Sequence, residues 1–208
     1  MRHRMAGNRI NMPEPRRRAA VRSMVDGLFI WEHINTTDAR AKVAQGEAER
    51  LIAIAIRGHK RSWEHLTAAV PDSETAERVL ALARRARFSL DETVPSNEER
   101  AQAGKYPLGP DARKRREDRL AALKKEMLGI IKDHDEAQAA LTAAREAMAF
   151  ELHARRMILK RLPRETTVKK IFEQFVPKYS GRQGGYTRIT KLGTRRGDAA
   201  LIVRLELV

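Results

Sequence analysis

Residues 181–199 read Gly-Arg-Gln-Gly-Gly-Tyr-Thr-Arg-Ile-Thr-Lys-Leu-Gly-Thr-Arg-Arg-Gly-Asp-Ala. This stretch holds five Gly and five Lys or Arg against a single carboxylate. An alternating run at 186–192 is followed by a turn at 193–198 and a second run at 199–208, a pattern that predicts a β-ribbon. Glycine lets another backbone approach closely, and arginine pairs with phosphate oxygens. The ribbon is therefore suited to contact with a phosphate chain.

Excess positive charge is confined to the two ends of the chain. The 208 residues carry 42 Lys and Arg and 27 Asp and Glu, a formal net charge of +15. Residues 1–60 contribute +6 and residues 151–208 contribute +9, whereas residues 61–150 hold 16 of each sign. Such a charge predicts a polyanionic partner, nucleic acid first and an acidic membrane surface second. The balanced middle is typical of a solvated helical element.

The composition excludes several classes of protein and site. The chain has no Cys, so disulfides and thiolate zinc sites are excluded and a reducing compartment is expected. No apolar run approaches the roughly 20 residues that cross a bilayer, and the N-terminus has no apolar core of a secretory signal. The Arg-rich, acid-poor N-terminus leaves an organelle transit peptide as an alternative.

Residues 1–14 are interpreted as a basic RNA-binding arm. The first 22 residues contain seven Arg and one Glu and offer almost nothing to bury. Such an arm would order on RNA, where phosphate contacts offset the lost chain entropy. The alternative is a disordered tail that binds nothing.

The segment that follows predicts two helices joined by a short strand. Pro15 can open a helix over 16–33, in which apolar residues recur near every 3.6 positions. Residues 34–37 form a β-prone link, after which Asp38 caps a second helix that is expected to end at Gly58.

The last third predicts two more helices before the ribbon. Residues 151–162 are expected to be helical up to Pro163, and a further helix begins at Thr166 or Thr167 and stops at Pro177. Together these elements predict an α+β fold. Residues 15–60 and 151–208 would form a two-layer domain of about four helices on a small sheet, with 34–37 beside the C-terminal strands.

Residues 61–150 are expected to form an inserted antiparallel helical hairpin. One helix would cover 73–90, a Pro- and Gly-rich loop 91–110, and a single long helix would run from Asp111 to beyond 148. Steps of three and four predict a coiled-coil seam in this long helix. The seam residues are Leu120, Leu123, Met127, Ile130, His134, Ala137, Leu141, Ala144 and Met148.

No pattern indicates catalysis or a bound cofactor. The six His show neither a Cys partner nor a His-Glu-x-x-His pattern, so no metal site is expected. His134 would be a partly exposed core position or a device that sets register. No nucleophile-elbow or Walker motif is present. Gly181–Gly185 could pass as a nucleotide-phosphate loop, but it precedes a strand instead of opening a helix, so the phosphate it meets is expected to belong to an RNA backbone.

Several side chains keep two interpretations or a packing role. Tyr186 could stack on a base or pack in the core, and Trp31 and Trp63 are assigned to packing. Arg18 and Arg22 repel each other at a spacing of four, which a neighbouring phosphate would relieve. A second cationic cluster is expected at the start of a helix, where cations oppose the dipole, which again suggests an external anion. The cluster comprises His153, Arg155 and Arg156.

The two ends of the chain resemble the bacterial large-subunit ribosomal protein family L17, over about 1–58 and 151–208. Within the first block the matching residues are Met1-Arg2-His3-Arg4, Gly7, Arg17, Arg22, Glu32, Ile34, Thr36-Thr37, Ala41-Lys42 and Leu51-Ile52. Within the second block they are His153-Ala154-Arg155-Arg156, Phe172, Gly184-Gly185-Tyr186-Thr187-Arg188-Ile189, Lys191, Arg195, Gly197-Asp198 and Glu206-Leu207-Val208. Residues 61–150 have no counterpart in that family pattern.

The resemblance implies a cytoplasmic, non-enzymatic constituent of the large (50S) ribosomal subunit near the exit of the peptide tunnel. Its expected partners are 23S-type ribosomal RNA and neighbouring large-subunit proteins, with no membrane, small-molecule substrate or cofactor. Recognition would be mainly of RNA shape and backbone. The expected RNA-binding residues are Arg2, His3, Arg4, Arg9, Arg16, Arg17, Arg18, Arg22, Lys42, His153, Arg155, Arg156, Arg182, Gly184, Gly185, Tyr186, Arg188, Lys191, Arg195 and Arg196.

A rival function remains open. The chain could be a free adaptor or nucleic-acid-binding protein with a projecting helical hairpin. Such a protein would bind duplex DNA and ribosomal RNA equally well, and it would share the salt dependence that phosphate contacts cause.

Overall fold

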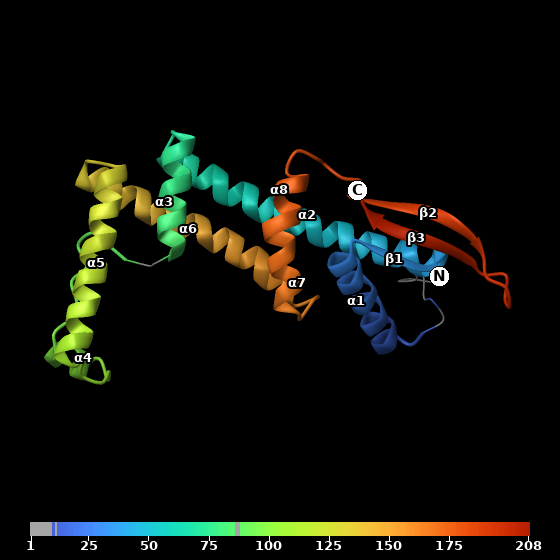
Figure 1. Cartoon of the computed structure of the whole chain (residues 1–208), viewed down its shortest axis with the longest axis horizontal. Coiled ribbons are helices and arrows are strands. Elements are labelled where there is room, and N and C mark those ends of the chain that lie inside the picture. Colours follow the sequence, from blue (N-terminus) through green and yellow to red (C-terminus); the bar gives the residue numbers. More distant parts are fainter. Residues whose placement is uncertain (1–9, 11, 86–87) are drawn as a thin grey trace, which may run out of the picture. The chain divides into compact units, whose positions relative to one another are not determined.

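The computed structural model of the protein describes residue 10, residues 12–85 and residues 88–208. These residues form two compact units (Figure 1). The first unit comprises the described residues up to Lys60 together with Glu151–Val208, and the second unit comprises Arg61–Phe150. Each unit buries a hydrophobic core of its own.

The first unit contains a three-stranded antiparallel sheet in the order β1-β3-β2. The strands are β1 (His33–Thr37), β2 (Thr187–Thr194) and β3 (Leu201–Leu207). Ile34 of β1 and Ile189 of β2 both lie opposite Leu205 of the central strand. Leu205 is fully buried, so one face of the sheet covers the core. The expected α+β class is confirmed, and β1 pairs with a C-terminal strand as the sequence predicts.

Two helices from the N-terminal part of the chain, α1 (Glu14–Trp31) and α2 (Asp38–Ala69), contribute residues to this core. Pro15 lies in the first turn of α1, where a missing N–H costs no hydrogen bond, and Glu32 ends the helix with a left-handed φ of 63°. Leu28 and Phe29 are fully buried, and each burial contributes roughly 1.5–3 kcal/mol.

The expected end of α2 at Gly58 is wrong, because the helix continues to Ala69. A glycine ends a helix when it adopts a left-handed backbone, and Gly58 is not among the described residues with a positive φ. Gly58 is buried. Packing therefore outweighs the cost of about 1 kcal/mol that glycine carries relative to alanine inside a helix.

Pro177 does not stop the last helical segment, although the sequence predicts that it does. The segment comprises α7 (Glu165–Lys170), the π-helical turn η1 (Ile171–Phe175) and α8 (Val176–Tyr179). In the π turn the Val176 N–H bonds to the carbonyl of Ile171, five residues back. The changed register places Pro177 in the first turn of α8, where a helix tolerates a missing N–H.

Aromatic rings connect the helices of the first unit to its sheet. Phe29 of α1 lies 5.7 Å from Phe175 of η1, measured between ring centroids. Tyr179 of α8 lies 5.3 Å from Tyr186, which immediately precedes β2. Thr187 then donates a 2.8 Å hydrogen bond to Glu49 of α2. These contacts fix α1 and α2 against the rest of the first unit.

The second unit is built from five helical segments within the described residues. They are the last part of α2, α3 (Ser73–Arg85), α4 (Asn97–Gln102), α5 (Pro110–Ile130) and the first part of α6 (His134–Leu159). The expected helix over 73–90 ends at Arg85, and the expected loop over 91–110 contains α4. Ser96 and Glu99 form a capping box that starts this short helix.

The expected continuous helix beyond Asp111 is also wrong. The chain turns at Ile131, which has an extended backbone (φ −124°, ψ 116°), and α6 begins at His134. Met127 of α5 and Leu141 of α6 belong to one core. The apolar stripe is thus buried by two shorter helices that share a core. His134 is half exposed, lies 3.5 Å from the carboxylate of Asp91 and does not belong to the core described for the second unit.

The two tryptophans differ from each other. Trp63 packs against the core of the second unit, as expected. Trp31 is 71% exposed at the end of α1, so its expected packing role is wrong.

Candidate nucleic-acid interface

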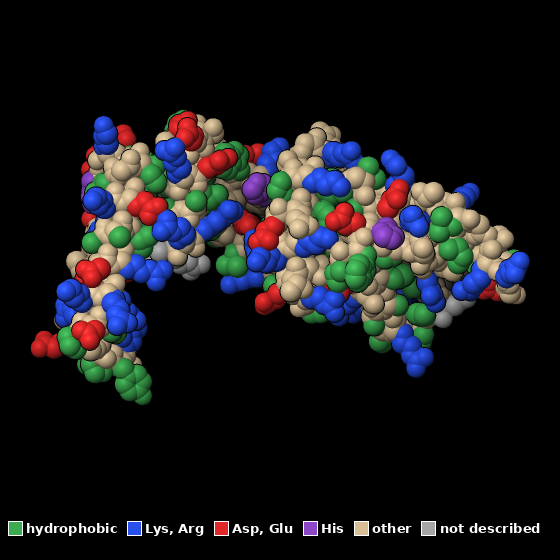
Figure 2. All heavy atoms as spheres, viewed as in Figure 1, with side chains coloured by type: hydrophobic (Ala, Val, Ile, Leu, Met, Phe, Trp, Pro, Cys, Tyr) green, Lys and Arg blue, Asp and Glu red, His purple; other side chains and the backbone are tan. Residues whose placement is uncertain are grey.

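Lys and Arg side chains are scattered over the helices and the sheet of the first unit (Figure 2). Their number alone therefore does not mark a site. A groove of about 840 Å³ lies within this unit, bounded by α1, α2 and the end of α6. We call this cavity the basic groove, because seven cationic side chains line it. They are Arg17, Arg18, Arg22, Lys42, Arg50, Lys160 and Arg161.

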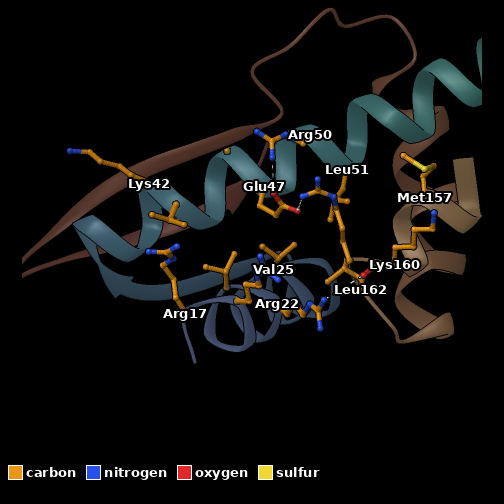
Figure 3. Close-up of a pocket in the computed structure, with 15 residues that line it drawn as sticks. Arg17, Arg22, Val25, Lys42, Glu47, Arg50, Leu51, Met157, Lys160 and Leu162 are labelled. Carbon is orange, nitrogen blue, oxygen red and sulfur yellow. Dashed lines mark hydrogen bonds and ion pairs between the residues drawn. The ribbon is translucent and has the colours of Figure 1, made fainter. Parts of the chain in front are cut away.

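Helical spacing places these cations on the groove. Lys42, Gly46 and Arg50 recur at steps of four along α2, so they share one side of that helix. A methyl group added at Gly46 would meet no atom within 4 Å, so the wall between the two cations is open. Figure 3 shows Arg17 reaching from α1 toward α2. The Arg22 guanidinium donates a 3.5 Å hydrogen bond to the carbonyl of Lys160.

The groove has an apolar floor beneath its cations. Val25 and Leu51 are fully buried and Leu162 is nearly so. This floor keeps the backbones of α1 and α2 in place, and the long cationic side chains extend past it toward solvent.

One carboxylate, Glu47, lies among the residues that line the groove. Its oxygens accept from Arg161 at 2.6 Å and from Arg50 at 3.2 Å. The Glu47 side chain is 20% exposed, and the pair with Arg161 holds α2 against the chain that follows α6. Arg17 and Lys160 have no ion-pair partner among the described residues, so the groove carries a net positive charge.

Two other groove cations form pairs at exposed positions. Arg18 pairs with Glu14 one turn earlier in α1, and Lys42 pairs with Asp38 at 2.7 Å. Exposed pairs of this kind contribute roughly 0–1 kcal/mol, so a phosphate could replace either carboxylate at little cost.

The β2–β3 ribbon presents a second set of cations. Lys191 and Arg196 are exposed and have no ion-pair partner among the described residues, whereas Arg188 lies 3.9 Å from Glu206. The Arg195 side chain donates hydrogen bonds to Asp198, and these bonds lower the pKa of the Asp198 carboxyl to about 2. Arg195 is therefore already occupied by an anion within its own loop.

The Gly-rich segment before β2 is exposed from Gly181 to Gly185. Gly185 has a φ of 66°, a conformation that a side chain would strain. Arg182 is exposed within this segment, and a methyl group added at Gly184 would meet no atom within 4 Å. Tyr186 is only 4% exposed, and its hydroxyl donates to the carbonyl of Arg182 at 3.2 Å. Of the two roles considered for Tyr186, the structure supports core packing, and its ring is not available to stack on a base.

The cluster at 153–156 lies inside α6 and not at the start of a helix, so the expected conflict with the helix dipole is wrong. His153 and Arg156 are exposed. Arg155 lies 4.6 Å over the ring of Phe172 and pairs with Glu151 at 3.0 Å, so it braces α6 against η1.

Some expected RNA-binding residues lie outside these surfaces. Arg16 is exposed on α1 but does not line the groove. Arg2, His3, Arg4 and Arg9 fall outside the described residues.

Sequence reasoning missed three groove cations, namely Arg50, Lys160 and Arg161. The spacing of four from Lys42 could have identified Arg50. Lys160 and Arg161 reach the groove only because the chain turns after α6, which no local pattern reveals.

No cluster of three or more His, Cys, Asp or Glu that could hold a metal ion occurs among the described residues. No helix in the same part of the chain is both long and apolar enough to span a membrane.

Comparison with known proteins identifies related chains. The family model described as Ribosomal protein L17 matches residues 20–208. A large ribosomal subunit protein bL17 from Clostridium acetobutylicum is 41% identical over 102 residues, which cover 44% of this chain and 90% of the relative. Proteins of the same name from Clostridium botulinum (strain Hall) and Thermoanaerobacter sp. (strain X514) are 57% and 59% identical over 58 residues. Those matches cover 28% of this chain and about half of each relative, 51% and 52%.

Proposed function

The chain belongs to the Ribosomal protein L17 family, and from this premise we propose that it is a structural constituent of the large ribosomal subunit. It binds and braces ribosomal RNA by neutralising phosphates, and it performs no catalysis. Its relatives carry the name of a large-subunit protein. Ribosomal RNA of the 23S type and neighbouring ribosomal proteins are its proposed partners, near the exit of the peptide tunnel.

The basic groove is the observation that carries this proposal. Seven cations converge on it from α1, α2 and the turn after α6, against the single carboxylate of Glu47. Arginine forks match the geometry of phosphate oxygens, and lysine adds a point charge. A groove with fixed walls, rather than a flat patch, favours the curved backbone of folded RNA over an extended acidic peptide.

The ribbon and the N-terminal arm extend the proposed contact beyond the groove. Lys191 and Arg196 are uncompensated on the ribbon within the described residues, and the exposed Gly184 and Gly185 allow close approach of an RNA backbone. Arg2, His3, Arg4 and Arg9 would add contacts from the arm. Arg195 would contribute only where RNA phosphate displaces Asp198.

The salt dependence of binding tests the groove. We define the groove variant as the full chain with Arg17→Ala, Arg22→Ala and Lys160→Ala. We define the control variant as the full chain with Arg78→Ala, Lys125→Ala and Lys132→Ala, which removes three cations from the second unit, outside the groove. Binding of each protein to large-subunit ribosomal RNA is measured between about 50 and 200 mM salt.

The control variant is expected to keep the slope of log K against log salt close to the wild-type value. The groove variant should flatten that slope by about 2–3, because each lost phosphate contact removes about 0.7–0.9. Equal slopes for the groove and control variants would contradict the assignment of the groove. Equal competition by duplex DNA and ribosomal RNA would instead support the rival free adaptor or nucleic-acid-binding protein.

A further inference from the structure

Within the described part of the chain, no element covers the first three turns of α5. From Pro110 to Arg119 every residue is exposed except Arg113, which is half-buried. Burial on this helix begins in its second half, at Leu123 and Met127. Packing against a core does not explain why these polar first turns are helical.

The apolar stripe of α5 continues into this exposed part as arginine. Met127, Leu123 and Leu120 follow one another at steps of four and three, and the same steps lead on to Arg116 and Arg113. The side of the helix that is buried in its second half is thus cationic in its first half. A second apolar helix would not cover such a surface, whereas a polyanion would.

Arg115, Arg116 and Arg119, in the exposed part of α5, have no ion-pair partner among the described residues. Arg115 and Arg119 are four residues apart, and Arg116 and Arg119 are three apart, so their like charges oppose each other on one side of the helix. Asp111 and Asp118 lie four residues before and three residues after Arg115, but neither forms an ion pair with it among the described residues. Arg113 is the exception, because it pairs with Glu117 at 2.9 Å. Figure 2 shows Lys and Arg side chains on this part of α5 and the neighbouring α4, with Asp and Glu side chains between them.

An exposed aromatic ring is held next to this helix. Tyr106 is 91% exposed and lies four residues before Pro110, where α5 begins. The guanidinium of Arg100 donates two hydrogen bonds to the Tyr106 carbonyl, at 3.1 and 3.0 Å. Asn97 exchanges two more with the backbone of Leu108, at 3.2 and 2.9 Å. The backbone that carries the ring is therefore fixed before any partner binds.

We propose that α5 and Tyr106 form a second RNA-binding surface, which takes a single-stranded RNA segment. Arg115, Arg116 and Arg119 bind its phosphates, and the Tyr106 ring stacks on an unpaired base. The immediate chain neighbours of Tyr106 are Lys105 and Pro107, and a cation next to an exposed ring suits a base and its phosphate. This surface lies in the second unit and shares no residue with the basic groove.

Two full-length variants separate the two parts of this surface. The first carries Arg115→Ala, Arg116→Ala and Arg119→Ala, and the second carries Tyr106→Ala, with Tyr106→Phe as its conservative partner. Binding to fluorescein-labelled oligouridylate and to an RNA duplex of equal length is measured by fluorescence anisotropy at several salt concentrations. The control variant defined above removes three charges from the second unit and leaves these three arginines in place, since its one α5 residue, Lys125, lies in the second half of that helix.

The arginine variant should flatten the salt slope for oligouridylate by about 2, since three lost contacts each account for about 0.7 on single strands. Tyr106→Ala should weaken oligouridylate binding at least about fivefold without changing the slope, because a lost base stack removes no phosphate contact. Tyr106→Phe should bind as the wild type does, and the duplex should not respond to Tyr106→Ala.

Binding of oligouridylate by both variants at the level of the control variant would overturn the proposal. A loss that is equal on duplex and single strand, with no effect of Tyr106→Ala, would overturn its single-strand specificity. Repeating the series in the groove variant keeps the two sites distinguishable. If the groove variant binds ribosomal RNA as the wild type does, the basic groove fails while the effects at α5 remain interpretable.

Discussion

At the scale of single residues, Tyr179 places a polar group where nothing pairs with it. Its ring is fully buried, and its hydroxyl oxygen has no hydrogen-bond partner among the described residues. Burial also raises the pKa of the hydroxyl above its ordinary value of 10.0. An unsatisfied buried hydroxyl costs roughly 1–3 kcal/mol.

Tyr179→Phe is therefore expected to raise the free energy of unfolding by about 1 kcal/mol, measured by urea denaturation. The wild type should lose stability as the pH rises above 10, because the unfolded state ionises there first, and the variant should lack this contribution. A variant less stable than the wild type by more than about 1 kcal/mol would show that the hydroxyl has a partner.

Asp198 is the residue with the clearest electrostatic prediction. Hydrogen bonds from the Arg195 side chain, and then from the Ala200 backbone, lower its pKa to about 2. Because the pKa is lowered, the contact stabilises the loop at pH values above 3.8, the ordinary pKa of the group. This stabilisation is lost only as the pH falls through about 2. A carboxyl titration by NMR should give a midpoint near the lower value. A midpoint near 3.8 would mean that Arg195 is free for RNA.

The sequence predicts which residues are candidates for RNA binding better than it predicts what surrounds each side chain in the fold. It places Arg17, Arg22 and Lys42 on the proposed interface. It leaves Tyr186 undecided and misassigns Trp31, because burial depends on which elements fold against each other. The turn predicted at 193–198 brings Asp198 close to Arg195 along the chain, but the sequence does not show that the two side chains pair.

At the scale of elements, Glu47 joins α2 to the chain after α6 and at the same time reduces the charge of the basic groove. Glu47→Gln keeps the shape of the side chain and removes the charge that Arg50 and Arg161 share. The variant should bind ribosomal RNA several-fold more tightly, with a salt slope steeper by up to about 1 because one more phosphate can be neutralised.

The stability of the Glu47→Gln variant should fall by no more than about 1 kcal/mol, since the pair is partly exposed. Glu49→Gln serves as a control of equal charge, because Glu49 bonds Thr187 and does not line the groove. Weaker RNA binding by Glu47→Gln than by Glu49→Gln would argue that Glu47 positions the groove cations and does not oppose RNA.

The helices show where local patterns lose to packing. Gly58 and Pro177 are expected to end helices, and neither does, because burial and a π turn accommodate them. The break at Ile131 is missed for the converse reason. An apolar stripe predicts that a side is buried, but it does not say whether one long helix or two shorter ones bury it.

At the scale of the whole molecule, the two cores share no residue. Met127 is fully buried in the second unit, so Met127→Ala should destabilise that unit by roughly 2–5 kcal/mol. Hydrogen exchange should show lost amide protection within Arg61–Phe150 and retained protection in β3 and α1. Equal losses in both units would show that they unfold as one.

The distribution of net charge along the chain indicates the region of the basic groove, but it does not indicate the proposed surface on α5. The ends carry all the excess charge, and the basic groove lies there. Residues 61–150 are neutral as a whole, yet α5 segregates its arginines on one side. Such a surface becomes visible only once the helix that carries it is known to be uncovered.

Sedimentation of a cell extract through a sucrose gradient tests the central claim most directly. The account predicts that the wild-type chain migrates with the large ribosomal subunit, and that the groove variant dissociates at a lower salt concentration than the control variant. Wild-type chain found at the top of the gradient, free of subunits at low salt, would contradict the account.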